Sequence, residues 1–189
     1  MPPFHRRAAR APRTLFLAFL LFLVATPSIA NAADPSWDGL RGHIRTTDDR
    51  LRRLLDVGMR SSPTFRALVH RLLESDVVVY LWCNSTKAAA VDGRLTFLSA
   101  AGGLRYVVVQ LARLQPRERQ IAIIAHELQH AVEIANAPDV IDAESLGREY
   151  RRIGYISSFA LSIKQTFDTS AAVEAGETVL REMTAASEY

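Results

Sequence analysis

The sequence has a single cysteine among its 189 residues, so no disulfide bond can form within the chain. It also lacks internal repeats and tracts of low complexity, which excludes a repeat architecture. Without disulfides the protein must be stable through its own hydrophobic core, and a chain of this length can bury one. Length and composition therefore predict one globular domain.

The sequence also lacks an apolar run long enough to span a membrane. The apolar run Leu15–Ala25 has 11 residues, whereas a spanning helix needs roughly 20. Four arginines precede this run, and Ala30 and Ala32 follow it in an A-x-A arrangement. These features predict a secretory signal peptide over residues 1–32, cut after Ala32, in preference to a membrane anchor. We expect residues 33–189 to be exported as a single domain, periplasmic or secreted.

Little net charge remains once the predicted signal peptide is set aside. The whole chain has 23 basic and 20 acidic residues, a net charge of +3. Four of the basic residues are arginines of the signal peptide, so the rest carries 19 basic and 20 acidic residues, a net charge of −1. This balance gives no reason to expect nucleic acid or an anionic membrane as a partner.

Hydrophobic periodicity predicts an α+β fold with helices on either side of a small sheet. Apolar residues at helical spacing follow capping residues near the N-terminus, β-branched and aromatic segments come next, and helical spacing then returns. A turn at Ala101-Gly102-Gly103 joins two of the strands. We expect an antiparallel sheet of about three strands. The predicted helices lie within 46–60, 61–75, 116–135, 139–153 and 168–183, and the predicted strands within 76–83, 94–99 and 104–111.

The segment "AHELQH" places His126 and His130 four residues apart and Glu127 directly after the first histidine. On a helical wheel with His126 at 0°, His130 lies at about 40° and Glu127 at about 100°. The opposite face is apolar and predicts contact with the core. Its residues are Ile121, Ile124, Ala125, Leu128, Val132 and Ala135. The two imidazoles and the carboxylate therefore share the side away from this stripe.

This spacing suits a metal ion. Imidazoles one helical turn apart can both reach one ion at about 2.0–2.1 Å. Glu127 is rotated away from the ion and can instead take a proton from a water molecule bound there. Two histidines that merely share a helix face are the simpler interpretation. We favour metal binding, because two of the four histidines after residue 32 have this spacing and neighbour a glutamate.

The motif resembles the HExxH signature of zincin metallopeptidases, whose extended form has uncharged flanking residues. Here these are Ile124, Leu128, Gln129, Ala131 and Val132. The resemblance implies Zn²⁺ bound by His126 and His130, Glu127 as general base, and a peptide or protein substrate. It also implies a zincin-like fold, in which a small sheet precedes the motif helix and an edge strand holds the substrate. The strand near 106–111 looks similar in order.

A catalytic zinc site usually has a third protein ligand. The glycine and histidine of the metzincin extension are absent, so we favour the gluzincin arrangement, with a glutamate on a later helix. Glu149 follows His130 after 18 intervening residues, and an antiparallel helix after Pro138 would bring it opposite the motif. We assign Glu133 a supporting or ion-pairing role. Asp168 is assigned as a helix cap, with Thr169 as the other candidate cap of the last helix. Glu144 and Glu174 are predicted to face away.

These features together predict an exported zinc metallopeptidase, in which Glu127 takes a proton from water and delivers it to the leaving amine. The alternative is a non-catalytic binding or structural protein of the cell envelope that keeps a zincin-like frame. An interaction module with an accidental motif is a third possibility. Tyr150, Tyr155 and Arg152 are left open as groups that could stabilise an oxyanion.

Overall fold

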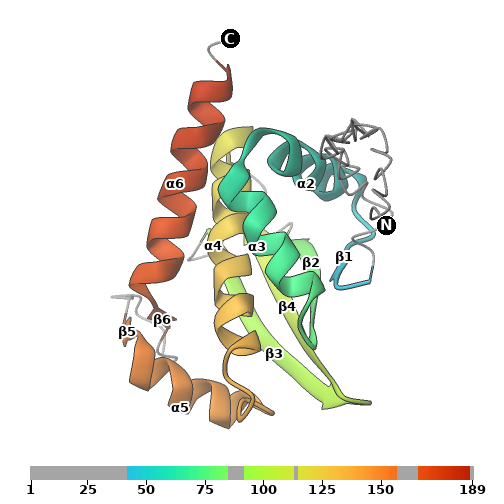
Figure 1. Ribbon diagram of the computed structural model, residues 1–189, viewed down its shortest axis with the longest axis vertical. Coiled ribbons are helices and arrows are strands. Elements are labelled where there is room, and N and C mark those ends of the chain that lie inside the picture. The colour runs from blue at the N-terminus through green and yellow to red at the C-terminus, as the bar shows by residue number, and fades with distance from the viewer. Residues whose placement is uncertain (1–41, 85–91, 113–114, 157–165, 188–189) are drawn as a thin grey trace, which may run out of the picture. The chain divides into compact units, whose positions relative to one another are not determined.

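The computed structural model describes residues 42–84, 92–112, 115–156 and 166–187, all within one compact unit, Ala33–Tyr189. The predicted signal peptide, residues 1–32, lies outside the described residues. The described part forms five helices, a four-stranded mixed sheet and a two-stranded sheet, which confirms the mixture of α and β structure (Figure 1). The helices are α2 (Asp49–Ser61), α3 (Pro63–Leu73), α4 (Arg117–Ala135), α5 (Ala143–Ile153) and α6 (Ser170–Ser187). The strands are β1 (Ile44–Arg45), β2 (Val77–Asn84), β3 (Gly93–Ala101), β4 (Leu104–Ala112), β5 (Tyr155–Ile156) and β6 (Phe167–Asp168).

The larger sheet has the strand order β1-β2-β4-β3. β1 pairs with β2 and β2 pairs with β4 in parallel, and only β3 runs antiparallel to its neighbour. The prediction of an antiparallel sheet of about three strands was therefore wrong in both strand number and direction. β4 lies between β2 and β3, so the strand that follows β2 in sequence is not its neighbour in the sheet.

The β3–β4 hairpin follows the turn signal read from the sequence. Ala101 pairs with Leu104, and the two residues between them, Gly102 and Gly103, have φ values of 60° and 77°. A two-residue hairpin turn of this kind needs positive φ at both central positions, which glycine adopts without steric cost. The pairing shifts register between Phe97 and Ser99 and then continues to the start of β3, where Leu95 pairs with Val109 and Gly93 with Leu111.

The core lies between one face of the sheet and α4. α4 packs on the sheet (Figure 1). Alternate residues of the strands point to this face and are buried against the apolar stripe of α4. Trp82, one of the residues that point the other way, is 67% exposed. The main buried residues are Val77, Val79 and Leu81 of β2, Val107, Val109 and Leu111 of β4, and Ile121, Ile124, Ala125, Leu128 and Val132 of α4. The apolar face predicted for α4 is therefore its core face.

Capping residues decide where the later helices begin. Gly154 ends α5 as predicted, but α5 begins at Ala143 because Asp142 and Ser145 form a capping box. The predicted start at residue 139 was therefore too early. Of the two predicted caps of α6, Thr169 is the one used, since its Oγ1 accepts a hydrogen bond from the Ala172 N–H at 3.1 Å.

α6 packs along α4 (Figure 1). A β-carbon at Gly176 would lie 3.3 Å from the carbonyl oxygen of Ala122, so glycine allows this close approach. Farther along α6, Glu182 accepts a hydrogen bond from Thr64 Oγ1 at 2.8 Å and so joins α6 to the start of α3. These contacts fix the position of the segment that precedes α6.

Among the described residues, no helix is both long and apolar enough to cross a membrane.

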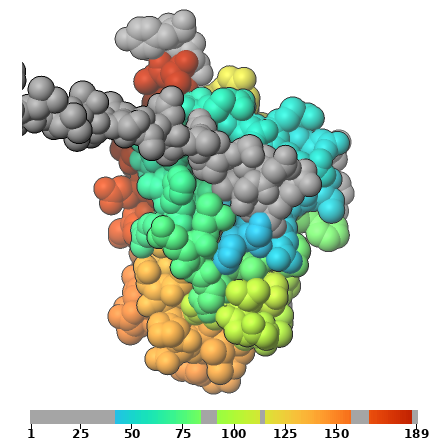
Figure 2. Space-filling model, turned by 45° about the vertical axis from the view of Figure 1, so that its right-hand side comes forward, coloured from blue at the N-terminus to red at the C-terminus, as the bar shows by residue number. Residues whose placement is uncertain are grey.

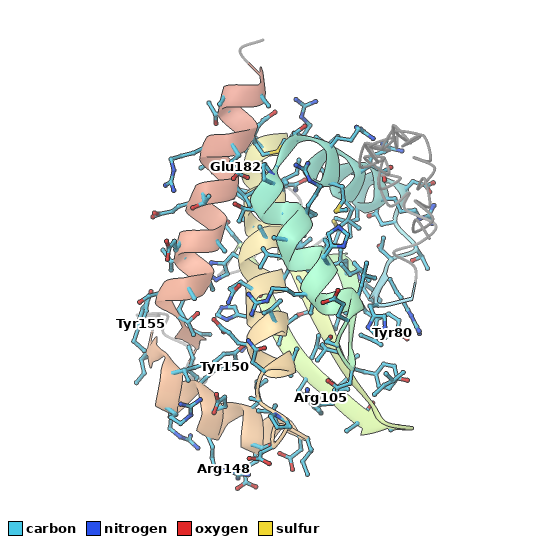
Figure 3. All side chains as sticks on the ribbon, viewed as in Figure 1. Tyr80, Arg105, Arg148, Tyr150, Tyr155 and Glu182 are labelled. Carbon is cyan, nitrogen blue, oxygen red and sulfur yellow. The ribbon has the colours of Figure 1, made fainter. Side chains whose placement is uncertain are left out.

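Arg105 ties the sheet to the end of α4 (Figure 3). Its guanidinium donates two hydrogen bonds to Asp76, at 2.7 and 2.6 Å, from a side chain that is 6% exposed. It also donates to the carbonyl oxygens of Ile134 at 2.7 Å and Ala137 at 2.6 Å, which lie at the end of α4 and just beyond it. The same side chain therefore pairs a carboxylate and satisfies carbonyl groups that have no partner within the helix.

Arg105→Ala is expected to lower the free energy of unfolding by about 3 kcal/mol, because it removes a buried guanidinium that pairs with Asp76 and donates to the carbonyl oxygens at the end of α4. Urea denaturation followed by circular dichroism measures this loss. Arg52→Ala is the matched control, because Arg52 pairs with the exposed Asp49, and its loss should cost less than about 1 kcal/mol. Equal losses in the two variants would contradict the role assigned to Arg105.

Candidate metal centre

α4 presents His126 and His130 on one side, as the helical wheel predicts. The two rings are 4.9 Å apart between centroids and lie nearly perpendicular, at 82°. The side chain of His126 is 24% exposed and that of His130 is 7% exposed. The pair therefore lies at the boundary between the core and a cavity.

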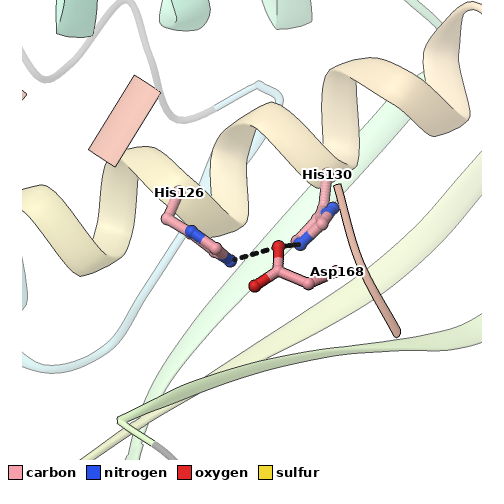
Figure 4. A group of neighbouring side chains, drawn as sticks. All are labelled: His126, His130 and Asp168. Carbon is pink, nitrogen blue, oxygen red and sulfur yellow. Dashed lines mark ion pairs between the residues drawn. The ribbon is translucent and has the colours of Figure 1, made fainter. Parts of the chain in front are cut away.

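Asp168 brings a carboxylate to both histidines. Its Oδ1 lies 3.4 Å from Nε2 of His126 and 3.6 Å from Nε2 of His130 (Figure 4). One ligand atom from each of the three residues lies within 4.8 Å of the other two, so this group could hold a metal ion. The residue that the structure places at the third position is thus Asp168, which the sequence analysis had assigned to a helix cap.

Glu149, the predicted third ligand, lies elsewhere. Its Oε2 accepts a hydrogen bond from Nε of Arg152 at 2.9 Å, and its side chain lines a separate hollow near Pro138 and Arg148. The helix α5 does follow α4, but the face of α5 toward the histidines carries Leu146 and Tyr150 instead. Glu149 is one residue away from that face, which is enough to turn it toward Arg152.

Thr169 explains why Asp168 is available. Because Thr169 caps α6, the carboxylate of Asp168 is not needed by the helix, although its Oδ1 also accepts from the Thr169 N–H at 2.7 Å. Asp168 lies in the short strand β6 and pairs with Tyr155 of β5. The signal in the sequence is that two adjacent residues, Asp168 and Thr169, can each cap the same helix, so one of them is available to the histidines.

Glu133 supports the site from one turn farther along α4. Its Oε2 lies 2.8 Å from Nδ1 of His130, and its Oε1 accepts a hydrogen bond from Oγ1 of Thr169 at 2.6 Å. A hydrogen bond from Nδ1–H to the carboxylate leaves Nε2 of His130 free to bind a metal. The contact with Thr169 also holds the start of α6, and with it Asp168, against α4. This arrangement fits the supporting role predicted for Glu133.

Glu127 is held in a narrow space between α4 and β3. The residue is 4% exposed, and its carboxylate accepts a hydrogen bond from the backbone of Leu95. A β-carbon at Gly93 would lie 2.5 Å from Oε1 of Glu127, so only glycine leaves room for the carboxylate there. Burial raises the pKa of Glu127 to about 7, although the charge of His130 opposes this. Such a group can both accept and release a proton near neutral pH.

The cluster concentrates negative charge around the two imidazoles. Burial lowers the pKa of His130, but its hydrogen bonds with Asp168 and Glu133 outweigh this and raise the pKa to about 9. Burial and the charge of His130 lower the pKa of His126. Burial opposes ionisation of Asp168, yet its hydrogen bond with His130 and the charge of His126 hold its pKa below the usual value. The carboxylates thus favour positive charge here, which either protons or a metal cation can supply.

In comparisons with known proteins, no family model, no curated protein and no solved structure matches this chain. The chemistry of the site is therefore inferred from its own geometry and from the HExxH motif. The zincin resemblance rests on that motif alone.

The cluster opens into a cavity of about 740 Å³. One wall is formed by residues 92–97 of β3 and the segment just before it, and the other by α4, α5, β6 and α6. β3 is the edge strand of the sheet beside the cavity, whereas β4 is internal. The strand near 106–111, which the sequence analysis placed in the position of a substrate-holding edge, therefore has neighbours on both sides.

Of the residues left open for oxyanion stabilisation, Tyr150 packs against a histidine of the cluster. Its ring centroid is 5.3 Å from that of His130, and its hydroxyl donates to the carbonyl oxygen of His130 at 3.4 Å. Tyr155 is 48% exposed, and Arg152 pairs with Glu149. Tyr150 thus packs against the candidate ligand and also lines the cavity.

Proposed function

We propose that this protein is a zinc-dependent hydrolase that cleaves peptide bonds. The observation that carries the proposal is the convergence of His126, His130 and Asp168 beside the buried carboxylate of Glu127, all on one cavity. A site that served only to stabilise the fold would not need Glu127 there. Export through the predicted signal peptide, residues 1–32, is part of the same proposal.

The donor set suits zinc. Ligand atoms about 2.0–2.1 Å from a tetrahedral ion lie about 3.3 Å from one another. The distances from Asp168 Oδ1 to the two Nε2 atoms, 3.4 and 3.6 Å, are close to this value. Two imidazoles and one carboxylate also make up a known catalytic zinc set that keeps one position open. A zinc ion held there would supply Lewis-acid chemistry, which lowers the pKa of water and polarises a carbonyl group.

The residues of the chain have separate roles in the proposed reaction. His126, His130 and Asp168 hold the ion, while Glu133 orients His130 through Nδ1. Glu127 takes the proton of the attacking water and passes it to the leaving amine nitrogen as the peptide bond breaks. The backbone of β3 holds the carboxylate of Glu127 through Leu95, so the base stays in position during both transfers.

The edge strand β3 suits an extended peptide. An edge strand presents backbone N–H and C=O groups that have no partner within the sheet, and a peptide can pair as an additional strand with those other than the Leu95 group that Glu127 takes. Residues 93–97 of β3 line the cavity directly opposite the motif helix. A substrate paired there would pass beside His126, Glu127 and Asp168.

Metal removal tests this function. Purified protein is expected to contain about one zinc ion per chain and to hydrolyse casein. Dialysis against a chelator should abolish hydrolysis, and one equivalent of zinc should restore it. A well-folded protein that binds no zinc when it is added would contradict the proposal. A zinc-loaded protein that cleaves neither casein nor any member of a peptide library would instead favour the non-catalytic envelope protein.

A further inference from the structure

The two ends of the cavity differ in chemistry. One end, near the start of α4, carries Asp92, Arg94, Arg119 and Glu177. Asp92 pairs there with Arg119, at 3.6 Å between Oδ2 and Nη2. Arg119 precedes His126 by seven residues, which is about 10 Å along the helix. The opposite end, beyond His130, is lined by Phe97, Leu146, Tyr150 and Phe167. The candidate metal centre therefore lies between a charged end and an apolar end.

One face of α5 forms the apolar end. Ala143, Leu146, Gly147 and Tyr150 line the cavity, and this spacing places all four on the same side of the helix. In the space-filling view α5, in orange, and the β3–β4 hairpin, in yellow-green, lie at the same end of the described part (Figure 2). Phe97 of β3, which is 8% exposed, contributes to the apolar end from the hairpin side.

Two of the four α5 residues are small, and this keeps the apolar end open. A β-carbon at Gly147 would meet no atom within 4 Å, although Gly147 lies on the face that lines the cavity. The residue sits within the helix, where glycine is less favourable than alanine. No neighbouring atom requires glycine at this position. The effect of glycine here is the space that a side chain would otherwise fill in the cavity.

We propose that the α5 end of the cavity is a specificity pocket for an apolar side chain of the substrate, and that Gly147 sets the size of this pocket. This rests on the proposed peptidase function for the identity of the ligand. Binding of an apolar side chain to a concave apolar surface with few polar groups is favourable, because it removes apolar surface from water. Its place beside His130 puts the bound side chain next to the bond that is cleaved.

A substitution at Gly147 tests the pocket through cleavage. Wild type is first incubated with a mixed peptide library, and mass spectrometry locates the cleaved bonds. The expected result is a preference for leucine or phenylalanine at one position beside the cleaved bond. For a matched pair of peptides with leucine or alanine at that position, Gly147→Leu should lower kcat/KM for the leucine peptide at least about tenfold and change the alanine peptide less than about threefold.

Glu144→Leu is the matched control, since it places the same leucine side chain on α5 at a position that is 81% exposed and outside the cavity lining, and it should behave as wild type. Zinc content should be unchanged in both variants. Hydrolysis by wild type without preference at any position would overturn the pocket and leave the peptidase function standing. A loss that is equal for both peptides in Gly147→Leu, with zinc retained, would also overturn it.

A binding measurement tests the pocket without catalysis. Titration with N-acetyl-leucine amide, followed by nuclear magnetic resonance, should shift the signals of Leu146 and Gly147, whereas N-acetyl-alanine amide should shift them little. Gly147→Leu should remove the response, and Glu144→Leu should keep it. Binding of the leucine amide by a protein that hydrolyses no peptide would support the pocket and contradict the peptidase. Absence of shifts in wild type at millimolar ligand would overturn the pocket.

Discussion

Replacing Asp168 with alanine is expected to lower the affinity for zinc at least about 100-fold, because the loss of even an outer hydrogen-bond partner of a metal ligand costs about 10–100-fold. Asp168 is the carboxylate whose Oδ1 lies 3.4 Å and 3.6 Å from the two imidazoles. The variant should stay folded, since Thr169 and not Asp168 caps α6. Competition for zinc with a fluorescent chelator measures the affinity, and circular dichroism verifies the fold.

Glu149→Ala is the matched control for this experiment. Glu149 is the carboxylate that sequence spacing favoured, yet it pairs with Arg152 away from the histidines. Its loss should leave the affinity for zinc within about threefold of wild type, as for a surface ion pair that contributes little. The account would be contradicted if Glu149→Ala lost zinc while Asp168→Ala kept it.

Replacing Glu127 with glutamine is expected to reduce kcat for peptide hydrolysis about 1000-fold, within the range for loss of a general acid–base group. Glutamine has nearly the same shape and can still accept the hydrogen bond from the backbone of Leu95. It cannot take a proton from water at neutral pH. Because His126, His130 and Asp168 remain, the zinc content should equal that of wild type.

The control for Glu127→Gln is Glu174→Gln, which removes an exposed carboxylate of α6. Its kcat should match wild type within about twofold, as expected for a surface substitution. Steady-state kinetics with one library-derived peptide, together with elemental analysis, measures both quantities. Unchanged kcat in Glu127→Gln would rule out the proposed general base, and loss of zinc from that variant would show that Glu127 has a different role.

The helix that carries the motif could be predicted because its signals are local. The 3.6-residue period separates the buried stripe of α4 from His126 and His130, and the same period explains why Glu127 lies beside them. Ser62 as cap and Pro63 as first residue of α3 are also local features, and both are present. Residues that belong to one helix can thus be placed from sequence.

The third position of the cluster could not be predicted by the same reasoning. Asp168 is 38 residues beyond His130, and its position depends on the packing of α6 on α4 and on the Glu133–Thr169 contact. Helical periodicity correctly predicted a helix after α4, but Glu149, chosen there by residue count, is one position off the face toward the histidines. A rotation of about 100° per residue is enough to exchange a ligand for a surface ion pair.

The sheet shows the same limit. The two glycines at the β3–β4 turn predict a hairpin, because the turn geometry is local. The parallel pairing of β2 with β4 joins Val79 to Val107 across the sheet. The apolar patterns of β2, β3 and β4 are equally compatible with several strand orders. Only packing against α4 distinguishes these orders, and that packing cannot be read from any one segment.

The most direct test of the central claim is anomalous diffraction at the zinc edge from crystals of the zinc-loaded protein. The account predicts one anomalous peak, about 2.0–2.2 Å from Nε2 of His126, Nε2 of His130 and a carboxylate oxygen of Asp168, with the carboxylate of Glu127 beside it. A peak coordinated by Glu149 or by other residues, or a folded protein with no peak between these two histidines, would contradict it.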